Sequence, residues 1–233
     1  MKDNTPLEII GFVKTDFPDK FGIPRQSGIV KSLKGKIIFQ PEYRDSSALR
    51  GLEGFSHLWI LWKFSKSVTK KWSPTVRPPR LGGNKRVGVF ATRSPFRPNP
   101  IGLSSVKIEN IIHNSPQGPI IEISGADLMD NTPIYDIKPY IPYTDSHPDA
   151  KGGFSDYVGG EKLEVFIPES LKNEMPSEKL SALREILAHD PRPAYQSDDD
   201  REYGFDFSDY SIKFKVKASQ LTVIKIQKIS KDN

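Results

Sequence analysis

Short runs of β-branched and aromatic residues, separated by turn residues, recur along the first 140 positions and predict a series of strands. We expect strands at 6–15, 29–33, 36–39, 55–64, 87–91, 101–108 with a continuation to 112, 119–124 and 134–137. Lys34-Gly35 predicts a hairpin between 29–33 and 36–39, and residues 114–118 predict another before 119. Only one helical turn, at 45–51, interrupts the strands. Such an order favours a mainly β fold, a single-sheet β-barrel or strongly curved sheet.

The pattern changes after residue 140. Polar and glycine-rich residues at 144–153 indicate a linker, which we place at 146–160. Beyond it we expect a strand at 162–167, a helix at 177–189 with Ser177 as its N-cap, and strands at 210–216 and 221–229. Prolines 191 and 193 end the helix. The prediction is therefore a barrel domain over 1–145 and a small α+β C-terminal domain over 161–233.

A stiff polar loop follows the strand expected at 87–91. Prolines at 95, 98 and 100 prevent a helix or a central strand from continuing, because proline lacks a backbone donor and fixes φ. Arg93, Arg97 and Asn99 are thereby held beside the core, as is typical of binding loops. The alternative is a proline-rich surface loop without a ligand.

The charge distribution favours the binding loop. Residues 54–108 contain eleven Lys and Arg and no Asp or Glu. Because the whole chain carries +5, the remaining residues sum to −6. A surface without a ligand normally mixes both signs, whereas clustered Lys and Arg most often meet phosphates. Trp72 lies in this stretch and could either stack on a base or anchor the loop on the core, and the sequence leaves both open.

Several classes of function are disfavoured. The chain has no cysteine, which excludes disulfides, thiolate metal sites and cysteine nucleophiles and fits a reducing cytoplasm. The four histidines are not paired at helical spacing, so we expect no metal site, and His57 is expected to be structural. No dinucleotide-binding or P-loop motif occurs, and Leu81-Gly82-Gly83 is a turn signal. We see neither a signal peptide nor a membrane span.

Several motifs occur together in one order along the chain. They are Phe21-Gly-Ile-Pro24-Arg25-Gln26, 51–60, Arg77-Pro-Pro-Arg80-Leu-Gly-Gly83, 88–102 with Arg93, Arg97 and Asn99, Thr132-Pro133 with 136–140, and Asp190-Pro-Arg192-Pro-Ala-Tyr195. With them the chain resembles the TsaA/TrmO-type tRNA methyltransferases. The resemblance implies a homodimeric β-barrel methyltransferase. It also implies that S-adenosylmethionine supplies a methyl group to N6 of threonylcarbamoylated adenosine at tRNA position 37.

The resemblance also implies site residues. The cofactor site would use Pro24, Arg25, Gln26, Ser65, Lys66, Arg93, Leu103 and the turn Asp130, Asn131, Thr132 and Pro133. The substrate tRNA would contact Arg77, Arg80, Arg97, Asn99 and the C-terminal motif residues Asp190, Arg192 and Tyr195. An acidic run at 198–200 directly follows that motif, where neutral or basic residues would be expected near RNA.

Methyl transfer from a sulfonium depends mainly on positioning and electrostatics. The acceptor nitrogen must lose a proton, and we name Asp136 as the candidate general base. The alternative role for Asp136 is that of a structural turn partner. Arg93 and Arg97 are expected to hold carboxylate or phosphate groups, with Asp127 and Asp130 facing positive groups of the cofactor. Two other functions stay open, a non-catalytic RNA-binding barrel and a methyltransferase with a different acceptor.

Overall fold

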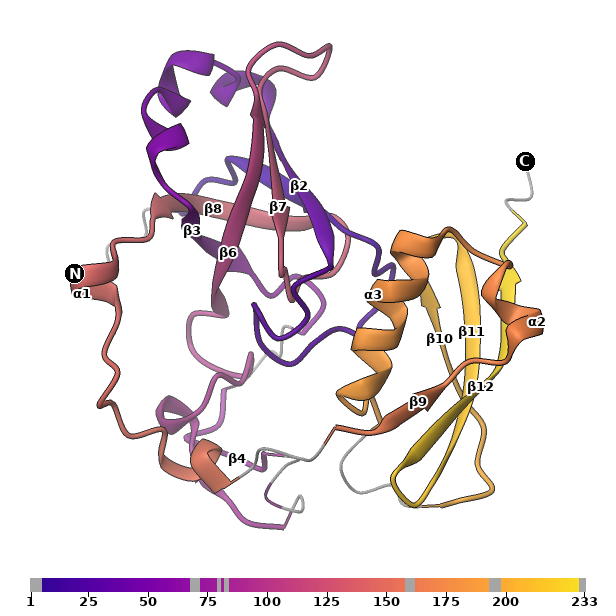
Figure 1. Ribbon diagram of the computed structural model, residues 1–233. Helices are drawn as coiled ribbons and strands as arrows, with labels where there is room; N and C mark the ends of the chain where they lie inside the picture. The colour runs from indigo at the N-terminus through magenta and orange to yellow at the C-terminus, as the bar shows by residue number, and fades with distance from the viewer. Residues whose placement is uncertain are drawn as a thin grey trace.

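The computed structural model describes residues 6–67, 72–78, 81, 84–157, 162–192 and 198–230. Six strands close into one antiparallel barrel in the order β1-β2-β7-β6-β3-β8 (Figure 1). They are β1 (Gly11–Lys14), β2 (Lys34–Phe39), β3 (His57–Lys63), β6 (Ile101–Ile112), β7 (Ile120–Ser124) and β8 (Thr132–Pro139). β1 closes the ring by pairing with both β2 and β8. The predicted single-sheet barrel is confirmed.

Alternation of apolar and polar residues explains the barrel strands. In β3, Leu58 and Ile60 are fully buried, while His57 and Trp59 point to the outer face. β6 follows the same rule, with Ser104 and Val106 inside. The inward residues form one hydrophobic core that includes Val13, Ile37, Ile121, Ile123 and Ile134. The expected strand at 55–64 and the hairpin of 101–112 with 119–124 are therefore confirmed.

Short elements surround the barrel. The 3-10 helices η1 (Pro41–Tyr43), η2 (Ser46–Leu49) and η3 (Leu52–Gly54) precede β3, and Asp45 caps η2 by accepting from the Ser47 backbone N–H. β4 (Thr75–Val76) and β5 (Val87–Gly88) form a separate two-stranded ribbon, followed by η5 (Val89–Ala91). After β8 come α1 (Pro142–Asp145) and η6 (Gly153–Tyr157).

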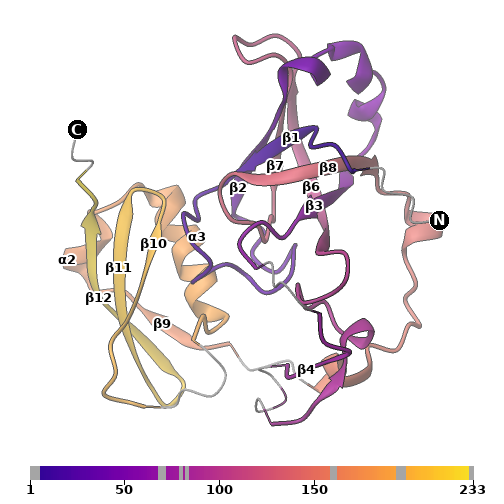
Figure 2. The ribbon, with the colours of Figure 1, turned by 180° about the vertical axis from the view of Figure 1, so that it is seen from behind.

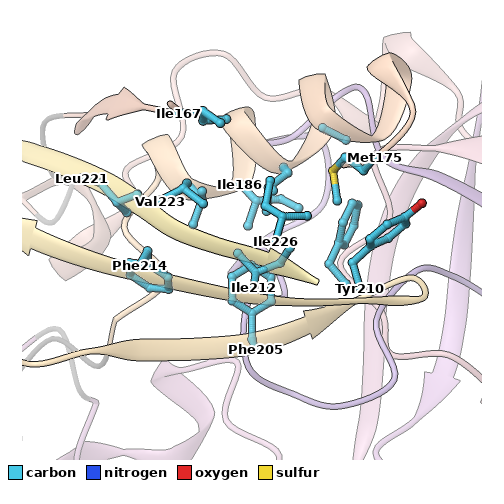
Figure 3. Close-up of a cluster of buried hydrophobic side chains, with 14 of the residues drawn as sticks. Ile167, Met175, Ile186, Phe205, Tyr210, Ile212, Phe214, Leu221, Val223 and Ile226 are labelled. Carbon is cyan, nitrogen blue, oxygen red and sulfur yellow. The ribbon is translucent and has the colours of Figure 1, made fainter. Parts of the chain in front are cut away.

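The C-terminal part is a four-stranded sheet covered by one helix. The sheet order is β10-β11-β12-β9, with β9 (Glu164–Phe166), β10 (Tyr203–Phe207), β11 (Tyr210–Lys217) and β12 (Gln220–Lys228). α2 (Glu169–Lys172) and α3 (Ser177–Ala188) follow β9. Figure 3 shows Ile186 of α3 above Phe205, Ile212 and Val223 of the sheet. This confirms the predicted small α+β unit.

Four expectations about individual elements are wrong. Residues 29–33 form turns instead of a strand, because Val30 and Leu33 are buried in the C-terminal core. Lys34-Gly35 consequently begins β2 and is not a hairpin turn. The strand expected at 87–91 is only two residues long and lies outside the barrel. Ser177 is the first helical residue, and Pro176 is the N-cap without a side-chain hydrogen bond.

The segment between β1 and β2 belongs to both parts of the molecule. Phe17, Val30 and Leu33 are buried together with residues of α3 and of the C-terminal sheet. Lys179 of α3 forms an ion pair with Asp16 over 2.7 Å. Figure 2 shows α3 lying next to this segment, between it and the C-terminal sheet. The division into domains at 145 and 161 stays a prediction, and the core of the C-terminal part includes residues of the N-terminal half.

Within the described residues, α3 with 12 residues is the longest helix, and no described helix is long and apolar enough to cross a membrane.

Candidate functional site

The loop between β1 and β2 connects the segments that the sequence assigned to the cofactor. The Gln26 side-chain oxygen accepts a hydrogen bond from the Arg93 guanidinium. The Lys20 ammonium donates to the Lys66 carbonyl oxygen over 2.6 Å and to the Ser67 hydroxyl over 2.7 Å. The Ser27 hydroxyl accepts from the Ser105 backbone N–H over 3.2 Å. Ser65 and Lys66, which follow β3, thus lie at the same end of the barrel as Arg93.

The turn before β8 is held to the beginning of that loop. The Asp130 carboxylate accepts from the Thr15 backbone N–H over 3.1 Å, and the Asp130 N–H donates to the Phe17 carbonyl over 2.7 Å. Asn131 has a φ of +60°, which asparagine tolerates better than most residues, and its side chain accepts from Lys14. Thr132 is buried and begins β8 together with Pro133. The four residues of the turn are therefore fixed beside residues 14–17.

A chain of hydrogen bonds runs from the barrel interior to this end. The Trp62 indole N–H donates to the Ser104 hydroxyl over 3.0 Å, and that hydroxyl donates to the Asp127 carboxylate over 2.6 Å. Burial raises the pKa of Asp127, and hydrogen bonds from Ser104 and the attraction of Arg93 offset only part of that rise. Sequence reasoning treated Asp127 only as a charge counterweight and did not assign it to the site.

Two assigned residues lie apart from this group. Leu103 points to the outer face of the barrel and is 52% exposed, because it alternates with the inward residues Gly102 and Ser104. Asp136, the candidate base, lies in β8, where its carboxylate pairs with Lys138 over 2.8 Å and accepts from the Ile137 N–H. These contacts suit the structural alternative for Asp136, and its role as a base stays a prediction.

A cavity of about 1460 Å³ opens next to Arg93. Its walls come from the 21–29 loop, the ribbon of β4 and β5, the 90–96 segment, residues 152–155 and the turn after α3. Arg25, Arg77, Arg86, Arg93 and Arg192 all line it, and no Asp or Glu is found among its described lining residues. Residues 54–108, which contain no Asp or Glu, therefore contribute Arg77, Arg86 and Arg93 to a cationic cavity wall.

The proline-braced loop presents its side chains near this cavity. The Arg97 guanidinium donates to the Thr92 carbonyl over 2.9 Å and lies 5.9 Å from the centre of the Phe90 ring. Asn99 is exposed. Trp72 stacks against Phe90 and remains 51% exposed, so it is not an anchor in the core. Arg80 and Tyr195 lie outside the described residues.

The C-terminal motif forms a compact turn after α3. The Arg192 guanidinium donates two hydrogen bonds to the Asp190 carboxylate, over 2.8 and 2.9 Å, and this pairing raises the pKa of Arg192. Arg25 donates to the Arg192 carbonyl over 3.1 Å, which attaches the turn to the cofactor loop. The acidic run 198–200 is exposed and precedes Arg201, whose guanidinium lies over the Tyr203 ring.

The described residues contain no group of three or more His, Asp or Glu side chains that could hold a metal ion. Charged groups of both signs lie in the segments that the sequence assigned to the cofactor. The Arg93 guanidinium donates to Gln26, and the Asp130 carboxylate accepts from the Thr15 N–H and lies 3.6 Å from the Lys14 ammonium. A ligand that carries both a carboxylate and a cationic group would meet groups of opposite charge in these segments.

The chain is similar to known proteins in both sequence and structure. The tRNA-methyltransferase O N-terminal domain matches residues 12–146, and the TrmO C-terminal domain matches residues 161–229. The tRNA (adenine(37)-N6)-methyltransferase of Escherichia coli is 40% identical over 95% of this chain and 97% of its own length. A Pseudomonas aeruginosa relative, whose name includes the words S-adenosylmethionine-dependent methyltransferase, is 38% identical over 84% of this chain and 85% of its own length.

A crystal structure of TrmO from Pseudomonas aeruginosa has a TM-score of 0.78 and 29% sequence identity, covering 98% of this chain and 99% of that one. The similarity thus includes the barrel, the C-terminal sheet and the segment between them. Because the N-terminal family model alone matches more than half of the chain, and the C-terminal model matches most of the remainder, the chain belongs to the TrmO family.

Proposed function

We propose that this protein is an S-adenosylmethionine-dependent methyltransferase that methylates N6 of adenosine 37 in tRNA, with threonylcarbamoyladenosine as the acceptor nucleoside. The observation that carries the proposal is the 40% identity, across both domains, to the Escherichia coli tRNA (adenine(37)-N6)-methyltransferase. The cationic cavity supports a polyanionic substrate, and the donor set around Arg93 and Asp130 supports the cofactor. The threonylcarbamoyl group rests on the motif resemblance.

The chain's own residues contribute position and charge. When bound, S-adenosylmethionine supplies an electrophilic methyl group. Arg93, oriented by Gln26, would hold an anionic group, and Asp130, held by Thr15, would balance a positive one. Holding both reactants in one geometry supplies most of the rate enhancement in such a displacement.

Removal of the acceptor proton is assigned to Asp136 as a hypothesis. Its ion pair with Lys138 favours the structural alternative. Turnover by Asp136→Asn at saturating tRNA distinguishes the two roles, because loss of a general base lowers the rate by about two to four orders of magnitude. Unchanged turnover would remove Asp136 from the chemistry.

We also propose a homodimer. Leu61 and Leu103 are register partners on the outer barrel face, and Leu103 is more than half exposed. The homodimer rests on the family resemblance, and Leu103 offers an exposed apolar side chain for a contact between subunits. Sedimentation of the wild type and of Leu103→Glu would test it, and a monomeric wild type would refute it. We also propose a cytoplasmic location, which a tRNA substrate supports.

Nucleoside mass spectrometry of tRNA from a deletion strain tests the function. We expect the N6-methylated form of threonylcarbamoyladenosine to disappear while the unmethylated form accumulates. Calorimetric titration of the protein with S-adenosylmethionine separates the enzyme from a non-catalytic RNA-binding barrel, which would bind tRNA without binding the cofactor. Unchanged tRNA nucleosides would point to a different acceptor.

A further inference from the structure

The segment that joins the barrel to the C-terminal domain forms part of the cavity wall. Figures 1 and 2 both show the chain after α1 passing close to β4 before it reaches β9. Gly152, Phe154 and Ser155 of this segment line the cavity together with the arginine-bearing loops. Sequence reasoning described the segment only as a linker.

Local hydrogen bonds fix this part of the segment. The Asp156 carboxylate accepts from the Gly152 N–H over 2.9 Å, and the Ser155 hydroxyl donates to the Gly152 carbonyl over 2.7 Å. A Cβ atom at position 152 would lie 2.1 Å from an Asp156 carboxylate oxygen, so any other residue there would displace the Asp156 side chain that accepts from the Gly152 N–H. Gly153 has a φ of +60°, which also favours glycine. The turn therefore holds Phe154 in η6 at one place on the cavity wall.

The cavity around Phe154 combines aromatic rings with positive charge. Phe21, Phe90 and Phe96 line it in addition to Phe154. Single-stranded nucleic acids bind where bases stack on aromatic rings while arginines contact the backbone. At about 1460 Å³, the cavity also exceeds the 300–1,000 Å³ of ordinary small-molecule sites. It therefore has room for a nucleotide in addition to the cofactor.

We propose that Phe154 stacks on an unpaired base of the tRNA anticodon loop next to the acceptor adenosine. The inference rests on the proposed function, because it takes tRNA as the RNA, and it adds a base-binding residue on the segment between the two domains. The competing explanation is that Phe154 only anchors this segment on the barrel by apolar packing.

Phe154→Leu separates the two explanations, because leucine keeps an apolar side chain and removes the aromatic ring. The probe is an anticodon stem-loop of roughly 17 nucleotides that carries threonylcarbamoyladenosine. Its affinity for the full-length protein is measured by fluorescence anisotropy. Loss of one base stack should weaken binding roughly 5- to 150-fold. Phe154→Trp should restore the affinity. S-adenosylmethionine affinity, measured by calorimetry, should be unchanged in both variants.

Phe166→Leu is the matched control. Phe166 in β9 is 53% exposed and does not line the cavity. This variant should bind the stem-loop as the wild type does. If Phe154→Leu and Phe166→Leu bind the stem-loop equally well, the proposal is overturned.

A mutant cycle identifies the base. A stem-loop with an abasic site at the stacked position already lacks the interaction, so Phe154→Leu should cost little on that RNA, although it costs much on the intact one. Each loop position next to the acceptor is tested in turn. If the affinity lost through Phe154→Leu and the affinity lost through the abasic site add up at every loop position, Phe154 has a structural role and the stacking is refuted. Should the wild type bind the stem-loop without methylating it, the proposed function fails, while the stacking is still decided by the cycle.

Discussion

The Arg25 guanidinium donates a hydrogen bond over 3.1 Å to the carbonyl oxygen of Arg192, a residue 167 positions later in the chain. Arg25 belongs to the loop that also positions Arg93 through Gln26, and Arg192 belongs to the turn after α3. This contact links the segment assigned to the cofactor with the segment assigned to tRNA. A disturbance of one part of the site is therefore expected to reach the other.

Replacement of Arg25 by alanine should weaken tRNA binding more than it weakens the fold. The hydrogen bond to Arg192 contributes only about 1 kcal/mol to the fold. Arg25 also lines the cationic cavity, where one hydrogen bond to a charged ligand is worth about 1.5–3 kcal/mol, so we expect a roughly 10- to 150-fold lower tRNA affinity. Arg184→Ala is the control, since its guanidinium donates to the Val165 carbonyl over 2.8 Å within the C-terminal domain. Equal tRNA affinities of the two variants in anisotropy titrations would contradict the proposed link.

Replacement of Arg93 by alanine should weaken S-adenosylmethionine binding. A hydrogen bond to a charged group is worth about 1.5–3 kcal/mol, so we expect a roughly 10- to 150-fold higher dissociation constant in calorimetry. Arg93→Lys should recover only part of the affinity, because lysine lacks the planar, bidentate donor set. Arg86→Ala serves as the comparison. Its guanidinium is bonded to Thr75 on another wall of the cavity, so it should leave cofactor affinity unchanged.

Asp127 is expected to position the site instead of reacting. It accepts from Ser104, whose hydroxyl also accepts from Trp62, and it attracts Arg93. Asp127→Ala leaves the Ser104 hydroxyl without its acceptor, which should lower the free energy of unfolding by about 1–3 kcal/mol. Asp127→Asn retains an acceptor but removes the charge.

Asp127→Asn should therefore keep the stability of the wild type and still bind the cofactor more weakly. Thermal unfolding and calorimetry on the same samples measure both properties. Wild-type cofactor affinity in Asp127→Asn would limit Asp127 to a structural role.

The strands that could be predicted from the sequence are those whose inward side chains all pack into one core. In β3 and in the β6–β7 hairpin, buried apolar residues alternate with more exposed ones along the strand. This period of two can be recognised from the strand's own residues. Residues 29–33 have a similar apolar content, but Val30 and Leu33 pack into a core formed mostly by residues beyond 160. Nothing local to that stretch shows which core it joins.

β10 is an element that sequence reasoning missed although a signal was present. Tyr203, Phe205 and Phe207 alternate and are all buried, which is the period of a half-buried strand. The acidic run before it and the Gly204 between the aromatic residues obscure that period. The strand expected at 87–91 was too long. Only Val87 and Gly88 pair with β4, and residues 89–91 form a 3-10 helix in which only Val89 is buried.

The sequence motifs predicted which residues belong to the candidate site, but they did not predict how the segments that carry these residues are held together. Motif residues identified the Arg93 loop and the Asp130 turn, but the loop at 15–28 that connects them became visible only through contacts such as Lys20 with Lys66. Phe154 lies in a glycine-rich stretch that is typical of a linker, so its place on the cavity wall had no local signal.

Glu185 should make the contact between α3 and the 31–32 segment sensitive to acid. Burial raises its pKa, but hydrogen bonds from Ser32 and the Lys31 N–H outweigh burial, so its folded-state pKa is lowered. A lowered pKa means that its stabilisation is complete above the unfolded-state value, near 4.3, and is lost as the pH falls through the folded value. Denaturation between about pH 7 and pH 3 measures this loss.

Glu185→Gln should cost about 1.5–3 kcal/mol at neutral pH and should show a weaker loss of stability on acidification than the wild type. Glu178→Gln is the control on the same helix, at an exposed position. Parallel acid profiles of the wild type and Glu185→Gln would show that this contact does not contribute.

Gly102→Ala should destabilise the barrel at the point where its interior supports the site. A Cβ atom there would lie 2.1 Å from the Trp62 ring, which is too close for any real contact. The ring packs against Phe64 and donates to Ser104, so moving it would also disturb the hydrogen bond from Ser104 to Asp127. Overpacking of this kind costs about 1–3 kcal/mol, and each kcal/mol lowers the melting temperature of a chain of this size by about 2–4 °C.

The matched substitution is Gly54→Ala, where an added Cβ meets no atom within 4 Å. It should melt within about 2 °C of the wild type, since surface substitutions usually change stability by less than about 0.5 kcal/mol. Gly102→Ala should in addition bind S-adenosylmethionine more weakly at a temperature where it is fully folded, because the displaced Trp62 no longer orients Ser104 toward Asp127. If Gly102→Ala melts like Gly54→Ala, the Trp62 ring does not limit space at this position. If it melts early but binds the cofactor normally, the hydrogen bonds from Trp62 to Asp127 support the barrel alone.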